Sequence, residues 1–253
     1  MLEESFSDGR SLIHDLDPRA KVIVAGIFSL MVAISDRLLP LIMAALLALI
    51  FVALAKLPVK KICYRLLVVN GLLLLIWLFL PFTMEGERLW SVGPLTATRE
   101  GIIYSALITI KSNSIILTVM ALIATMPAFT IGRALRHLHF PDKMVHLFYF
   151  TYRYIHAIQR EYRRQINAIK IRGFIPRTNM HTYRTYAYLI GMLLIKSYDR
   201  AERVRAAMLC RGFKGQFYDL QEFSLRSSDL IIMILMLLAI TGIGLLQWTE
   251  IIY

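Results

Sequence analysis

The sequence predicts an all-α polytopic membrane protein with about five transmembrane helices and a cytoplasmic module of long helices. The chain of 253 residues is 57% hydrophobic, with a mean hydropathy of +0.59. That is too apolar for an ordinary soluble domain. Five runs are long or apolar enough to cross a bilayer, for which a helix needs about 20 residues. Between the fourth and the fifth run lies a basic block, residues 129–228, that contains no such run.

The apolar runs cover residues 20–36, 38–55, 66–82, 101–127 and 229–249. The first run ends at Ser35-Asp36 and Pro40 opens the second, so we expect these two runs to form a tight helical hairpin. Asp17 is a favourable N-cap for the first helix, with Pro18 at its first position. From there Lys21 can extend back to the lipid headgroups.

The charge pattern predicts the orientation. The whole excess of +12 lies in residues 129–228, which hold 18 Lys and Arg against 6 Asp and Glu. Cytoplasmic loops of membrane proteins are enriched in Lys and Arg. With the N-terminus inside, the segments 1–21, 56–65 and 129–228 carry 25 of the 29 basic residues. We therefore expect the N-terminus and the basic block in the cytoplasm and Tyr253 outside.

These boundaries divide the chain into three segments. Residues 1–128 hold the first four membrane helices, residues 129–228 hold the cytoplasmic helices, and residues 229–253 hold the final transmembrane helix. Lys111 resists this scheme, because a lipid-facing charge in the middle of the fourth run costs about 3 kcal/mol. Either a short interfacial helix ends near Lys111 before the span begins, or the side chain faces a protein partner.

The basic block predicts two long helices and a shorter one at about 130–140. A stretch without Gly or Pro runs from Pro141-Asp142 to Ile171, which gives a helix about 45 Å long. A second helix can begin at Thr178, as N-cap, and end at Cys210. Neither contains 20 consecutive apolar residues, so we expect both to lie against the membrane or against each other.

Each long helix ends in the tripeptide Arg-Gly-Phe. The windows NAIKIRGF (167–174) and AAMLCRGF (206–213) align without a gap. The glycine lets the backbone turn at the helix end, and the arginine presents a fork of donors suited to carboxylates or carbonyls. The dipole of each helix favours a cation at its C-terminus, which could explain either arginine taken alone. It does not explain why both helices end in the same Ala-x-x-x-Arg-Gly-Phe pattern. We therefore predict that a soluble partner docks on Arg172, Gly173, Phe174, Arg211, Gly212 and Phe213.

Motifs for catalysis or for a bound cofactor are missing. The chain has no phosphate-binding loop of the Gly-x-x-x-x-Gly-Lys-Ser/Thr type, so it carries no nucleotide site of that kind. His137, His139 and His146 have no cysteine nearby and only Asp142 as a local carboxylate, which supports a closed metal site poorly. We therefore predict no catalytic residue, no metal site and no cofactor in this chain.

Two other functions fit part of the pattern. A membrane-embedded enzyme acting on lipid headgroups would use the basic block to grip phosphate, but it needs an acid, base or metal constellation that we cannot assemble. A membrane-anchored nucleic-acid binder suits the charge, and its tyrosines could stack on bases. Interfacial tyrosines beside lipid explain the same residues, so we expect no nucleic acid among the partners.

Three short segments of the chain resemble a known family. They are His14-Asp15-Leu16-Asp17-Pro18-Arg19-Ala20-Lys21 and the two motifs Ile171-Arg172-Gly173 and Cys210-Arg211-Gly212. With Ser197–Phe213, they resemble the transmembrane T component of energy-coupling factor (ECF) transporters, most closely the CbiQ type linked to cobalt uptake. Nickel and a vitamin are the alternative cargoes that this resemblance leaves open. The likeness covers essentially the whole chain. The first position of both motifs departs from the alanine of the family.

The resemblance implies a role and a set of partners. Two CbiO-like ATPase subunits, which carry ATP and magnesium, would each receive one helix tip. A CbiM-like substrate-binding S component, which can be accompanied by a small CbiN-like subunit, would be held by the membrane helices. The chain would then be a non-catalytic, multi-pass subunit of an ABC importer in the inner membrane of a prokaryotic cell. In this role Arg172 and Arg211 are anchors, Gly173 and Gly212 are turns, and the phenylalanines are apolar plugs.

Overall fold

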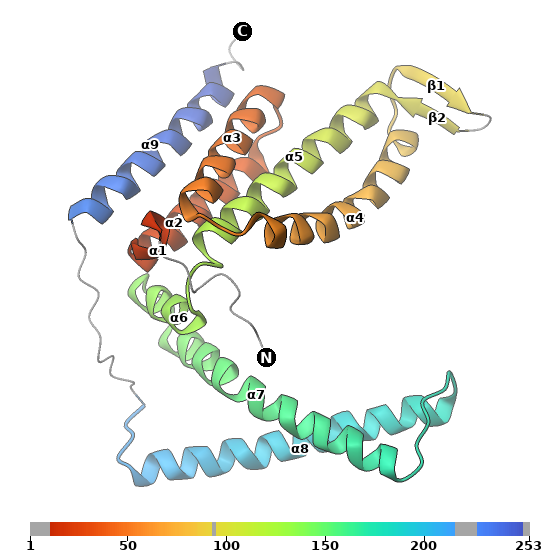
Figure 1. The fold of residues 1–253 in the computed structure, drawn as a ribbon, viewed down its shortest axis with the longest axis vertical. Helices are drawn as coiled ribbons and strands as arrows, with labels where there is room; N and C mark the ends of the chain where they lie inside the picture. Colours follow the sequence, from red (N-terminus) through yellow and green to blue (C-terminus); the bar gives the residue numbers. More distant parts are fainter. Residues whose placement is uncertain (1–10, 93–94, 216–226, 250–253) are drawn as a thin grey trace. The chain divides into compact units, whose positions relative to one another are not determined.

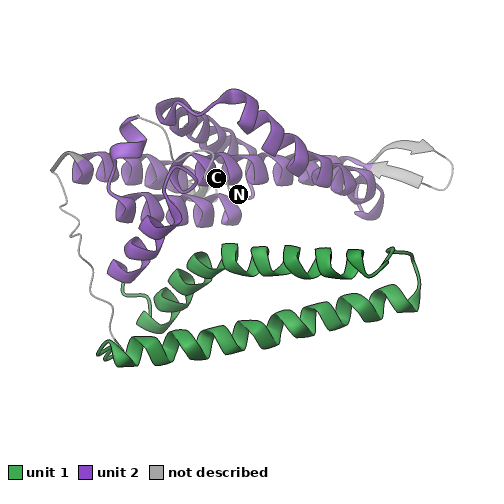
Figure 2. Cartoon of the chain, turned by 60° about the horizontal axis from the view of Figure 1, so that its bottom comes forward, with its two compact units in different colours: residues 1, 139–222 green, residues 2–138, 223–253 purple. Residues whose placement is uncertain are grey.

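The computed structural model describes residues 11–92, 95–215 and 227–249 (Figure 1). These residues divide into two compact units (Figure 2). The membrane unit comprises 11–92, 95–138 and 227–249, and the polar unit comprises residues 139–215. All six predicted docking residues lie in the polar unit.

The membrane unit is helical apart from one short β-hairpin that the sequence did not predict. Its strands β1 (Arg88–Val92) and β2 (Leu95–Thr98) pair antiparallel. They connect the C-terminal end of α4 to the N-terminal end of α5 (Figure 1). The helices are α1 (Leu12–Asp15), α2 (Pro18–Ile34), α3 (Leu38–Ala55), α4 (Val59–Thr83), α5 (Arg99–Leu122), α6 (Ala128–His137) and α9 (Ser227–Thr249).

The class of an all-α polytopic membrane protein is confirmed. In the described ranges, four helices are long and apolar enough to cross a membrane: α3, α4, α5 and the Asp229–Leu246 part of α9. The first predicted run forms α2, whose 17 residues give a length of only about 26 Å. The chain thus has four clear candidate spans and a shorter apolar helix, where five spans were predicted.

A buried charge fixes the start of α2. The side chain of Asp17 accepts a hydrogen bond from the N–H of Arg19 at 2.8 Å, which confirms the predicted N-cap. Lys21, by contrast, does not extend to solvent. It is buried, and its Nζ donates to the carbonyl of His14 at 3.1 Å. The short helix α1, which the sequence did not predict, brings that carbonyl back over α2 and replaces the expected contact with headgroups.

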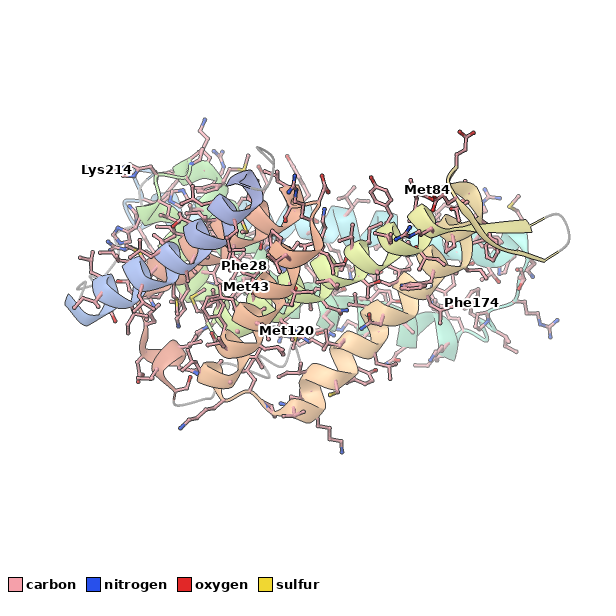
Figure 3. All side chains as sticks on the ribbon, turned by 90° about the horizontal axis from the view of Figure 1, so that it is seen from above. Phe28, Met43, Met84, Met120, Phe174 and Lys214 are labelled. Carbon is pink, nitrogen blue, oxygen red and sulfur yellow. The ribbon has the colours of Figure 1, made fainter. Side chains whose placement is uncertain are left out.

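The core of the membrane unit lies between α2, α3, α5 and α9. Phe28 of α2 and Phe51 of α3 are both buried and pack edge to face, with ring centroids 6.2 Å apart. Met120 of α5 and Ile240 of α9 are buried in the same cluster, of which Phe28 and Met120 are labelled in Figure 3. Alanines such as Ala48 let these helices approach closely, as is usual where helices pack within a bilayer.

Lys111 lies within a continuous α5, so no short interfacial helix ends there. Its Nζ donates to Oδ1 of Asp36 at 2.8 Å and to the carbonyl of Ala33 at 3.3 Å. The partner is therefore the turn between α2 and α3 of the same chain. An opposite charge at this distance offsets much of the cost of placing an ammonium group in a membrane helix.

Two further polar contacts join α4 to α5. Asn70 and Asn113 exchange reciprocal amide hydrogen bonds of 3.2 and 3.1 Å. Nearer the β-hairpin, Nε1 of Trp77 donates to Oγ1 of Thr109 at 2.9 Å. Because lipid offers no hydrogen-bond partners, these contacts fix the register of the two helices.

The helix α6 packs on α2 and so belongs to the membrane unit. The charge pattern groups it with the basic block, because it carries Arg133 and Arg136. The compact polar unit begins ten residues after the predicted boundary at residue 129, at His139. Buried Gly132 and Ala134 give α6 the small face that a close contact needs.

The polar unit consists of two long helices, α7 (Asp142–Ile171) and α8 (Met180–Cys210). Both bounds of α7 and the end of α8 agree with the prediction. The N-cap of α8 is Asn179 and not Thr178, because the Asn179 side chain reaches the N–H of Thr182 at 2.9 Å. The hydroxyl of Thr182 in turn accepts from the N–H of Arg177 at 3.1 Å, which closes the turn before the helix.

The two helices of the polar unit run antiparallel. Glu161 of α7 accepts a hydrogen bond from Nζ of Lys196 on α8. Thirteen residues later, the ring of Phe174 lies 6.0 Å from that of Tyr186, ten residues earlier on α8. The contacts therefore advance along α7 while they retreat along α8.

Substitution of Asn70 by Leu should destabilise the membrane unit by about 1 kcal/mol, because the amide of Asn113 loses its partner across α4 and α5. The double variant Asn70→Leu/Asn113→Leu should recover most of this loss. Unfolding in mixed detergent micelles measures both free energies, with Val68→Leu as an exposed control on α4. Additive losses in the double variant would show that the two amides do not interact.

Candidate functional site

The first Arg-Gly-Phe sequence ends α7 in a Schellman motif. Arg172 is the C-cap, and Gly173 adopts a left-handed conformation with φ of +79°. The N–H of Gly173 donates to the carbonyl of Lys170 at 3.0 Å. The N–H of Phe174 donates to the carbonyl of Ile169 at 3.1 Å. These two bonds satisfy carbonyls that the helix end would otherwise leave without partners.

The second sequence repeats this geometry at the end of α8. Arg211 is the C-cap, and φ of Gly212 is again +79°. The N–H of Gly212 donates to the carbonyl of Leu209 at 3.0 Å, and that of Phe213 to the carbonyl of Met208 at 3.1 Å. The repeated sequence thus gives the same backbone at both helix ends, as the two glycines predict.

The arginines and the phenylalanines at these ends differ in exposure. Arg172 and Arg211 are both exposed, whereas Phe174 and Phe213 are half-buried. Each arginine therefore presents its guanidinium group to solvent in the isolated chain. Each phenylalanine is partly covered by its own unit, and its predicted role as an apolar plug stays a prediction.

The partners of the two phenylalanines were not predicted from the sequence. The ring of Phe174, labelled in Figure 3, lies 6.1 Å from the ring of His181 and meets Tyr186 edge to face. Phe213 lines a groove between α7 and α8. The sequence offers contact with lipid or stacking on bases for the tyrosines of the block, and only the fold of residues 172–179 brings Tyr186 back to the first tip.

The structure does not bring the two tips together. The first lies beside Tyr186, near the start of α8, and the second is the end of α8 at Arg211. At about 1.5 Å per residue, the 25 residues between them separate the tips by roughly 40 Å. They are two separate ends of one antiparallel helix pair.

A single ion pair connects the middle of the two helices. Glu161 accepts from Lys196 of α8 and also lies 4.0 Å from Arg164 of its own helix. The Lys196 ammonium, through this hydrogen bond, lowers the pKa of the Glu161 carboxyl below its ordinary value of 4.5. The carboxylate is therefore charged at neutral pH and holds α7 against α8.

The described part of the chain brings no three His, Cys, Asp or Glu side chains close enough to hold a metal ion. The predicted docking residues are likewise no catalytic set, because each tip offers one cation, one turn and one aromatic ring. Such a tip can bind a carboxylate or a set of carbonyl groups in a receiving groove.

Comparison with known proteins identifies the family. The sequence model of the CbiQ family, described as cobalt transport protein, matches residues 9–221, which is well over half of the chain. The chain belongs to the CbiQ family. Its match spans α1 to α8 and includes both Arg-Gly-Phe tips.

Relatives of this CbiQ protein carry a related name. Proteins called energy-coupling factor transporter transmembrane protein EcfT occur in Leuconostoc gelidum, Ruminiclostridium cellulolyticum and Bacillus subtilis. They are 29%, 24% and 23% identical to the chain, over 83%, 82% and 85% of its length and 82%, 81% and 85% of theirs. The chain is therefore a T component of the CbiQ type, a non-catalytic transmembrane subunit of an ECF transporter.

Each of the substitutions Gly173→Ala and Gly212→Ala should destabilise its helix end by about 1–2 kcal/mol, because a Cβ is unfavourable at positive φ. Hydrogen exchange of the Phe174 and Phe213 amides should accelerate accordingly. The control is Gly191→Ala within α8, where no atom lies within 4 Å of the added methyl group, and which should slow exchange or leave it unchanged. Equal protection in all three variants would refute the role of the two turns.

The Glu161–Lys196 pair should make the spacing of α7 and α8 sensitive to acid. A carboxylate with a lowered pKa contributes stability above its unfolded pKa and loses it as pH falls through the folded pKa. Spin labels on the two helices should therefore report separation below about pH 4.5 in the wild type. Glu161→Gln should abolish this dependence, and the exposed Glu202→Gln should keep it. A transition that survives in Glu161→Gln would assign it to another group.

Proposed function

We propose that this T component couples two ATPase subunits to the uptake of cobalt through its two Arg-Gly-Phe tips. In this proposal each tip enters a groove on one ATPase, and the ATPases bind the ATP and magnesium. The observation that carries the proposal is the repeated Schellman geometry, with an exposed arginine at each of two separate helix ends. Two equal tips fit two equal receptors, as in a symmetric ATPase dimer.

The chemistry of the tips favours a receptor with carboxylates or backbone carbonyls. Arg172 and Arg211 remain charged at any physiological pH and offer several donors in a fixed plane. Gly173 and Gly212 direct the chain away from each helix axis, so that the arginine stays accessible. The half-buried phenylalanines would hold each tip in position against the pair of α7 and α8. We propose that they support the docking surface in this way.

The antiparallel pair suits the transmission of movement. Two ATPases that close on each other would displace tips roughly 40 Å apart. The Glu161–Lys196 link and the packing of Phe174 on Tyr186 join α7 to α8 at separate points along the pair. The helices would then move as rods and pass the displacement to the membrane unit.

The membrane unit would hold the substrate-binding S component, a CbiM-like protein with or without a small CbiN-like subunit. Its α4 exposes large apolar side chains, among them Leu67, Leu72 and Phe79, which suit a bilayer or a transmembrane partner. The distribution of Lys and Arg supports an N-terminus and a polar unit in the cytoplasm, with the C-terminus outside. Cobalt as the cargo rests on the description of the family, and the EcfT relatives are named without a substrate.

Charge reversal at both tips tests the proposal. Tagged Arg172→Glu/Arg211→Glu should lose its ATPase subunits on purification from detergent-solubilised membranes, because removing one partner of a charge pair that is buried in the complex costs about 2–5 kcal/mol. Each single variant should retain a partial complex through the remaining tip. The control Arg163→Glu/Arg203→Glu reverses two exposed cations on the same helices away from the tips and should keep both ATPases.

Two results would count against the proposal. If the wild-type protein purifies without any ATPase, the coupling function is contradicted and the alternative of an enzyme acting on lipid headgroups is favoured. Equal loss of ATPase in the tip variant and in the control would assign binding to the overall charge of the polar unit. Measurement of cobalt and nickel uptake by cells with the complete complex then distinguishes the two cargoes.

A further inference from the structure

An apolar groove of about 400 Å³ lies between α7 and α8, on the side of the second tip. This volume falls within the range of small-molecule sites, roughly 300–1,000 Å³. Aromatic and aliphatic side chains from both helices line it: Phe150, Tyr154, Ile158, Ala201, Val204 and Met208. Since all of them belong to the polar unit, the groove does not depend on how the two units are placed.

A cationic hollow of about 430 Å³ lies next to the groove. Arg160 and Arg164 of α7 and Arg200 of α8 line it, together with one carboxylate, Glu161. That carboxylate already accepts a hydrogen bond from Lys196. The hollow therefore carries an excess of positive charge and suits an anion with several acceptor oxygens.

The groove and the hollow meet at one residue. Arg200 is half-buried and lines both of them. Its aliphatic stem can border the apolar space while its guanidinium group borders the charged one, as long cationic side chains commonly do. A ligand that fills both spaces needs an apolar chain attached to an anionic head.

We propose that the groove and the hollow bind one anionic phospholipid, with an acyl chain along the groove and the phosphate group among Arg160, Arg164 and Arg200. Guanidinium groups bind phosphate through paired hydrogen bonds, which gives this head an advantage over a zwitterionic one. The cytoplasmic leaflet of a cell membrane contains such anionic lipids. The charge complementarity of the hollow selects this occupant over an apolar helix of a partner, which would leave the single carboxylate of Glu161 to balance three arginines and Lys196.

The bound lipid would support the second tip. Phe213 lines the same groove, so an acyl chain there contacts the aromatic ring that follows Arg211 and Gly212. The acyl chain would add its contacts to those that Phe213 already makes within the chain, which makes ATPase docking at the second tip dependent on lipid composition.

Spin-labelled phosphatidylglycerol, added in trace amounts to phosphatidylcholine nanodiscs that hold the full-length protein, tests the site. The wild type should immobilise this lipid in preference to spin-labelled phosphatidylcholine. Arg160→Gln/Arg164→Gln should weaken the preference about tenfold or more, through the loss of charge-assisted hydrogen bonds. The matched control Arg163→Gln/Arg203→Gln removes two cations from the same helices outside the hollow and should behave as the wild type.

Further arms separate the other occupants. Ala201→Phe should fill the groove and reduce immobilisation of the lipid while all arginines remain. Inorganic phosphate at millimolar concentration should displace little of the lipid, because it cannot use the groove. Complete displacement of the lipid by phosphate would show that the site binds simple anions and not specifically a lipid. An equal loss of the preference in the matched control would show that the preference comes from the overall surface charge. Cross-linking of the groove to a helix of a co-purified membrane protein, with no retained lipid, would overturn the proposal in favour of that partner.

Discussion

The left-handed turn at Gly173 and Gly212 is the constraint on which the polar unit depends. Each turn stops a helix of about 30 residues, satisfies its last carbonyls and leaves the preceding arginine exposed. Because both turns have the same φ, both tips have the same shape. The length of α8 then sets their separation at roughly 40 Å. Identity and separation of the tips together make two equal docking events possible on one chain.

The membrane unit satisfies a different constraint, since a polar side chain in a bilayer needs a partner within the protein. Lys111 meets Asp36, and Asn70 meets Asn113. These contacts link α5 to the α2–α3 turn on one side and to α4 on the other. The same helix carries Met120 in the core that α2, α3 and α9 share. A movement of α5 would therefore reach every part of the unit, which suits a subunit that transmits force.

The two proposals assign different tasks to the long helices. The tips would receive ATPase movement through their arginines, and the sides of the helix pair would bind lipid through an apolar groove and three further arginines. Arg200 and Phe213 connect the two tasks. Arg200 lines both the groove and the hollow, and Phe213 lines the groove at the second tip. An ATP-driven subunit built in this way would respond to the lipid around it without any additional domain.

The sequence by itself determined what depends on local chemistry. Apolar runs set the membrane helices, Asp17 and Pro18 set the start of α2, and Gly173 and Gly212 set the ends of α7 and α8, because capping acts within a few residues. Only the tertiary structure decided contacts between distant residues: Asp36 as the partner of Lys111, the burial of Lys21 under α1, the packing of α6 on α2, and Glu161 with Lys196. No periodicity or cap specifies such pairs, since they depend on how whole helices pack side by side.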